Sequence, residues 1–216
     1  METIKNKILE PTSENFALAA QCVKDGGVIV VPSDCNLGLT VNPWIDDAVE
    51  RVFAIKNRPF SKPLTLFFSH PDEWKEYAVA SDPDIVEELI KAFWPGPLNI
   101  ILKKNDNVPE KMVCGGETVS LSCAANPVWR GFMEYMQIPV AMTSANISGQ
   151  ADGFLVDLET AVLQVGDKVD YIIKGGANGT TKSSTIIDLT SEPSIVRYGD
   201  ITVEQLNKVV NIFPEL

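Results

Sequence analysis

Residues 26–39 read GGVIVVPSDCNLGL and indicate the class of fold around which the chain is built. Residues 28–31 are a β-branched run without polar alternation, which predicts a strand covered on both faces by helices. Small polar residues follow at positions 33–36, and Gly38 comes after them. A strand that ends in such residues is a common place for a ligand site. The stretch therefore predicts a buried strand with a candidate binding loop at its end.

The rest of the chain alternates irregularly between helical and strand patterns. Helical periodicity and capping residues predict helices over residues 12–25, 45–56, 82–93, 127–136, 158–165 and 202–210. Apolar runs predict strands over residues 28–31, 64–68, 98–102, 118–121, 139–142, 171–173, 184–189 and 194–197. This mixture is typical of an α/β or α+β fold with a mixed sheet. No repeat or linker divides the sequence, so we expect residues 1–216 to form a single domain.

The composition is that of an acidic globular protein with a substantial core. Hydrophobic residues make up 45% of the 216 residues, and the formal net charge is -11. This charge argues against a general nucleic-acid-binding surface but leaves room for a local basic groove. The four cysteines form no CxxC pair and His70 is the single histidine, so we expect no metal site. No apolar signal core or membrane-length run is present, so we expect a cytoplasmic protein with reduced thiols.

A basic turn interrupts this acidic background at residues 56–64, which read KNRPFSKPL. Lys56, Arg58 and Lys62 place three cations within seven residues, and two prolines fix the backbone around them. Cations on a shaped turn suit the binding of a phosphate or a carboxylate. Taken alone, the stretch is more typical of an ordinary solvated loop.

Three polar segments favour a binding role for the basic turn over a solvated loop. Residues 33–36, 143–148 and 175–184 each follow an apolar strand and are rich in Ser, Thr, Asn and Gly. Hydroxyls, amides and closely approaching backbone N–H groups suit phosphate binding without a covalent step. The sequence has no GxxxxGK[ST] motif. A role for His70 as a cap or surface residue is a better explanation than one as a catalytic base, and Cys35 is better explained as a small buried residue. Together with the basic turn, the segments predict a polyanion site.

Five motifs resemble those of the YrdC-like family, whose best-known members are threonylcarbamoyl-AMP synthases. They are Lys56-x-Arg58-Pro59 with Lys62-Pro63-Leu64, Phe93-Trp94-Pro95-Gly96-Pro97-Leu98, Ser144-Ala145-Asn146-x-Ser148-Gly149, Ser184-Thr185-Ile186-Ile187-Asp188-Leu189 and Val196-Arg197-x-Gly199-x-Ile201-Thr202. They occur in the family's order over about residues 15–202. The resemblance implies a twisted mixed sheet flanked by helices, with a concave, positively charged groove.

The resemblance also implies an activity and a set of site residues. Family synthases convert ATP, bicarbonate and L-threonine to threonylcarbamoyl-AMP and pyrophosphate for tRNA modification, with Mg²⁺ carried by the nucleotide. By position, Lys56 and Arg58 would be the catalytic residues that hold the carboxylate and phosphates. The residues that would bind ATP or AMP are Lys56, Arg58, Lys62, Ser144, Asn146, Ser184 and Arg197.

The acceptor side departs from the family pattern. Cys35 and Leu37 replace a threonine and a tyrosine, Phe67 replaces a histidine, and Ser122 replaces an arginine. The residues assigned by position to the substrate pocket are Ser33, Cys35, Leu37, Phe67, Ser122 and Thr143. Loss of a hydrogen-bonding set is costly for a polar ligand. Several hypotheses about function therefore stay open. The protein could use threonine or a less polar analogue as acceptor, or could form a carbamoyl adenylate without threonine. It could also be a non-catalytic protein that binds nucleotide or double-stranded RNA.

Overall fold

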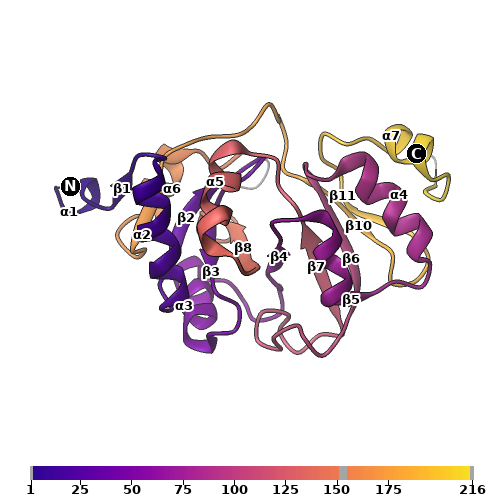
Figure 1. Cartoon of the computed structure of the whole chain (residues 1–216), viewed down its shortest axis with the longest axis horizontal. Helices are drawn as coiled ribbons and strands as arrows, with labels where there is room; N and C mark the ends of the chain where they lie inside the picture. Colours follow the sequence, from indigo (N-terminus) through magenta and orange to yellow (C-terminus); the bar gives the residue numbers. More distant parts are fainter. Residues whose placement is uncertain (1, 151–154, 215–216) are drawn as a thin grey trace.

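A mixed eleven-stranded sheet runs through the computed structural model, which describes residues 2–150 and 155–214 (Figure 1). Its strands are β1 (Ile8–Leu9), β2 (Ile29–Pro32), β3 (Leu37–Val41), β4 (Thr65–Phe67), β5 (Ala78–Val79), β6 (Leu98–Lys104), β7 (Thr118–Ser122), β8 (Val140–Ser144), β9 (Tyr171–Ile173), β10 (Thr185–Asp188) and β11 (Ser194–Arg197). Their order is β1-β9-β2-β3-β8-β4-β7-β6-β10-β11, and β5 pairs with β6. Strands β4 and β7 run parallel, whereas β3 and β8 run antiparallel. The predicted mixed α/β fold is confirmed.

Helices cover both faces of this sheet. They are α1 (Glu2–Lys5), α2 (Ser13–Lys24), α3 (Asp46–Lys56), α4 (Pro83–Phe93), α5 (Pro127–Met136), α6 (Leu158–Val165) and α7 (Val203–Val209), with a 3₁₀ turn, η1, at Pro71–Glu76. On one face, Phe16 of α2 and Trp129 of α5 belong to a buried cluster with Ile29 of β2. On the other face, α3, α4, α6 and α7 contribute to a second cluster that contains Val30. Strand β2 is therefore buried from both sides, as its sequence predicts.

Local signals set most element boundaries correctly. The Thr12 side chain accepts a hydrogen bond from the Asn15 backbone N–H, and Asp82 accepts one from Ile85 N–H. The predicted helix at 158–165 and the strands at 171–173 and 194–197 have the bounds that the structure shows. Strand β3 was not predicted, because Gly38 interrupts the apolar residues that follow the polar segment 33–36. In the structure the loop ends at Asn36, and β3 pairs antiparallel with β2.

Side chains alternate along β4, β6 and β7, so that polar residues face the side of the sheet opposite to the core. Leu66, Ile100 and Leu121 point into the cluster packed under α3, α4 and α7. Their neighbours along the strands therefore point to the opposite face, since successive side chains alternate. Those neighbours are Thr65, Asn99 and Ser120, and all three line a cavity. In the described part of the chain, no helix has the length and apolar character needed to cross a bilayer.

Candidate functional site

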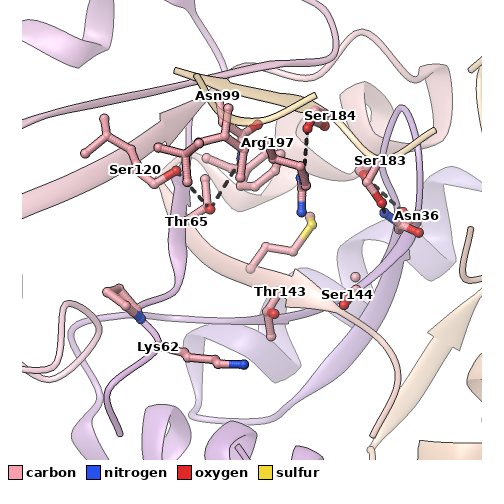
Figure 2. Close-up of a pocket in the computed structure, with 18 of the residues that line it drawn as sticks. Asn36, Lys62, Thr65, Asn99, Ser120, Thr143, Ser144, Ser183, Ser184 and Arg197 are labelled. Carbon is pink, nitrogen blue, oxygen red and sulfur yellow. Dashed lines mark hydrogen bonds between the residues drawn. The ribbon is translucent and has the colours of Figure 1, made fainter. Parts of the chain in front are cut away.

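A cavity of about 580 Å³ lies over the sheet face that carries β3, β8, β4, β7, β6 and β10. Its cationic side chains are Arg58, Lys62 and Arg197, and no Asp or Glu lines it among the residues that the structure describes. Serine and threonine residues line the same cavity, and Figure 2 shows Thr143, Ser144, Ser183 and Ser184 among them. In a chain of net charge -11, this composition makes the cavity a local exception suited to an anionic ligand.

The cavity collects most of the residues that the sequence assigned to a site. From the nucleotide set it is lined by Arg58, Lys62, Ser144, Asn146, Ser184 and Arg197, and from the acceptor set by Ser33, Phe67 and Thr143. Four assigned residues are buried behind its wall: Lys56, Cys35, Leu37 and Ser122. Leu37 is there because Gly38, the next residue of β3, faces the cavity, so the Leu37 side chain points into the core.

Lys56 is a buried lysine whose amino group supports the cavity rim at Ser144 and Asn146. Only 1% of the residue is exposed. Its Nζ donates to the carbonyl oxygens of Ser144 and Asn146, the latter at 2.7 Å, and lies 3.3 Å from Asn146 Oδ1. Burial, with a smaller contribution from Arg58, lowers the pKa of Lys56 to about 7. The structure thus assigns Lys56 a positioning role, and its direct contact with substrate stays a prediction.

Arg58 closes the basic turn on itself. Asn57 adopts the left-handed conformation (φ 49°) and ends α3, which turns the chain toward the cavity. The Arg58 Nε donates to Lys62 O at 2.8 Å, and one Nη donates to Pro63 O at 2.9 Å. Burial lowers the pKa of the guanidinium. Since a guanidinium carries five N–H donors, most remain for a ligand.

The opposite rim joins three distant segments. Arg197 Nε donates to Ser184 O at 2.9 Å, and the Cys35 thiol lies 3.4 Å from Ser184 Oγ. The Asn36 amide donates to Ser183 Oγ at 3.1 Å, a contact drawn in Figure 2. The β2–β3 loop, the glycine-rich loop before β10 and strand β11 therefore form one wall.

Asp34 anchors this wall. Both carboxylate oxygens accept from Ala125 N–H at 3.0 Å, and the Asp34 carbonyl accepts from Asn178 N–H and Thr180 Oγ. Burial raises the pKa of Asp34, while backbone hydrogen bonds from Ala125 and Asn126 oppose that rise. The carboxylate is thus a structural acceptor that fixes the loop beside the cavity.

Replacing Asp34 by alanine is expected to lower the free energy of unfolding by about 1–3 kcal/mol, because the partly buried Ala125 N–H group loses its acceptor. Asp34→Asn keeps one oxygen acceptor, so we expect a smaller loss. Urea denaturation of both variants checks this, with Asp106→Ala as an exposed control. Equal stability of Asp34→Ala and Asp106→Ala would contradict the anchoring role.

Asn36 and Ser183 also line the cavity, and they lie in the polar segments 33–36 and 175–184 that were predicted to form the site. Three further polar residues of the lining were not predicted: Thr65, Asn99 and Ser120. A sequence signal for these three was present. Thr65, Asn99 and Ser120 each precede a strongly apolar residue within a predicted strand. A polar residue at such a position indicates that one face of the sheet meets water or a ligand. The predictions treated these strands as apolar runs and overlooked the alternation.

A family model named for Sua5, YciO and YrdC, and described as "Telomere recombination", matches residues 21–199. The chain belongs to the Sua5/YciO/YrdC family. This confirms the resemblance that the five motifs indicated.

Individual members of the Sua5/YciO/YrdC family resemble the chain over most of its length. It is 32% identical to a threonylcarbamoyl-AMP synthase of Pyrococcus abyssi over 198 residues, which cover 89% of this chain and 56% of that protein. A structure of P. abyssi Sua5 complexed with L-threonine aligns with a TM-score of 0.88 and 29% identity, over 95% of this chain and 61% of that one. The structure of E. coli YciO aligns with a TM-score of 0.80 and 27% identity, over 92% of this chain and 97% of that one. The chain thus spans little more than half of the P. abyssi protein and almost all of YciO.

Proposed function

We propose that the protein is a nucleotidyltransferase that makes threonylcarbamoyl-AMP from ATP, bicarbonate and L-threonine, with release of pyrophosphate. The observation that carries this proposal is the cavity itself, with Arg58, Lys62 and Arg197 in its wall and no acidic side chain among the described lining residues. The synthase among its relatives and the threonine in the Sua5 structure support the same reaction. We place it in the cytoplasm, with its product serving tRNA modification.

The reaction requires the protein mainly to position the carbamate and ATP and to stabilise negative charge on the phosphates. The threonine amine combines with bicarbonate, losing water, and gives a carbamate. A carbamate oxygen then attacks the α-phosphorus of ATP, the bond from this phosphorus to the bridging oxygen breaks, and pyrophosphate leaves with the electron pair. Such a displacement needs cations and N–H donors around the phosphates and an attacking oxygen in line with the leaving oxygen.

Each wall of the cavity has a part in this proposal. Arg58 and Lys62 on the basic turn, and Arg197 on the opposite rim, hold negative charge on the carbamate and phosphates. The hydroxyls of Ser144 and Ser184 add neutral donors for the phosphate and ribose region. ATP would bring Mg²⁺ as its own counter-ion.

The test is pyrophosphate release with each component omitted in turn. We expect release that requires ATP, bicarbonate and L-threonine together. Release with carbamoyl phosphate but without threonine would instead support carbamoyl-adenylate formation. Nucleotide binding without any product would support a non-catalytic protein. A salt-sensitive shift of double-stranded RNA, lost when Lys62 and Arg58 become alanine, would support the RNA alternative.

A further inference from the structure

Three neutral polar side chains form a cluster on the sheet floor of the cavity. Thr65 of β4 and Ser120 of β7 are paired in register, and their hydroxyl oxygens lie 3.2 Å apart. The Asn99 amide of β6 reaches Thr65 Oγ at 3.5 Å. Figure 2 shows the three side chains together, with both contacts drawn. We call Thr65, Asn99 and Ser120 the floor cluster.

Asn99 carries an acceptor that nothing in the described protein uses. The residue is 5% exposed, and its Oδ1 has no hydrogen-bond partner within residues 2–150 and 155–214. Of the four buried side-chain atoms in this condition, it alone belongs to a residue that lines the cavity. A buried amide oxygen left unpaired costs about 1–3 kcal/mol, so a donor from a bound molecule would satisfy it.

Apolar side chains border the floor cluster on β4, β6 and β8. Phe67 and Ile101 lie two residues further along β4 and β6, on the same face, and Met142 is the β8 partner of Thr65. A charged group placed against these three side chains would meet only neutral partners in the floor cluster and would lose hydration. A neutral N–H or O–H group would gain a partner. The floor cluster therefore differs in kind from the cationic rim formed by Arg58, Lys62 and Arg197.

We propose that the floor cluster is a specificity subsite that accepts the neutral hydroxyl or carboxamide side chain of the acceptor amino acid. This inference rests on the proposed function, because it assumes that the acceptor occupies the cavity. The amide and the two hydroxyls offer both donors and acceptors, so they match a polar side chain and leave an apolar isostere unable to satisfy Asn99. The chain departs from the family pattern at positions 35, 37, 67 and 122. The floor cluster supplies its polar groups from three other positions.

Asn99→Leu tests the subsite, because leucine removes the hydrogen-bonding atoms at nearly constant volume. For the wild type we expect kcat/KM of acceptor-dependent pyrophosphate release to favour threonine over valine, and asparagine over leucine, by at least about tenfold. In Asn99→Leu both preferences should fall to within about threefold, with the KM for ATP unchanged. Ser120→Ala, a milder change, should reduce them partly. Preferences that survive in both variants would overturn the proposal.

The result expected if the proposed function is wrong differs from the result expected if only the subsite is wrong. If the proposed function is wrong, no amino acid stimulates pyrophosphate release, and the subsite is tested by binding alone. Thermal shift or calorimetry with ATP present should show tighter binding of threonine than valine to the wild type and equal binding to Asn99→Leu. Equal binding of threonine and valine to the wild type would refute the subsite.

Discussion

Replacing Arg58 by alanine is expected to lower kcat/KM for acceptor-dependent pyrophosphate release by about 100- to 1,000-fold, because a cation that stabilises charge in the transition state is lost. Arg58→Lys keeps the charge but loses the planar fork, so we expect an intermediate loss of about tenfold. Arg58 donates hydrogen bonds to Lys62 O and Pro63 O. Lysine is not equivalent, because only the planar guanidinium can donate to both carbonyl oxygens and to a ligand at the same time. Steady-state kinetics on both variants measure the effect.

Lys208→Ala is the matched control for Arg58→Ala, because Lys208 is an exposed cation on α7, away from the cavity. It should leave the kinetics unchanged. If Arg58→Ala reduced kcat/KM no more than Lys208→Ala does, the basic turn would not be part of the site. A fall in thermal stability that tracks the loss of activity would indicate that Arg58 acts only by holding the turn.

Replacing Lys56 by methionine is expected to have the second large effect, on stability and activity together. At about pH 8 the variant should lose about 2–3 kcal/mol of unfolding free energy, because the carbonyls of Ser144 and Asn146 lose their buried donor. Release of the Ser144–Asn146 turn should lower kcat/KM by at least about 100-fold. Urea denaturation and pyrophosphate release measure the two effects, and Lys208→Met is the control.

The pH dependence of this stability loss follows from the lowered pKa of Lys56. Below about pH 7 the lysine is protonated in both the folded and the unfolded states. Between about pH 7 and its ordinary pKa of 10.5 the unfolded state binds the proton and the folded state does not, so the stability contributed by Lys56 rises with pH. The difference in unfolding free energy between wild type and Lys56→Met should therefore grow from about pH 6 to about pH 9. A constant difference over this range would show that Lys56 keeps its proton when folded.

Local sequence signals account for most of the fold. Helix α5 is predicted with its observed bounds, because Pro127 follows the capping residue Asn126 and apolar residues recur at helical spacing. Strand β3 could not be found in the same way. Gly38 interrupts its apolar residues, and its position follows from pairing with β2 and β8, which lie before and far after it in sequence.

The candidate site was predictable as a set of residues but not as an arrangement. Residues from motifs that lie far apart in sequence, such as Arg58 and Arg197, line one cavity. The direction of the Lys56 side chain could not be predicted, because it depends on the two carbonyls at the end of β8, 88 and 90 residues away. The alternation along β6 indicates that Asn99 points away from its apolar neighbours, but the presence of a cavity over that face depends on the packing of distant segments.

Mass spectrometry of the adenylate formed from ¹³C-bicarbonate, ATP and L-threonine decides whether the protein makes threonylcarbamoyl-AMP. We expect a threonylcarbamoyl adenylate that carries one ¹³C atom, in wild-type protein and at much lower yield in Arg58→Ala. An unlabelled threonyl adenylate, or no adenylate at all under conditions where ATP binds, would contradict the proposed function.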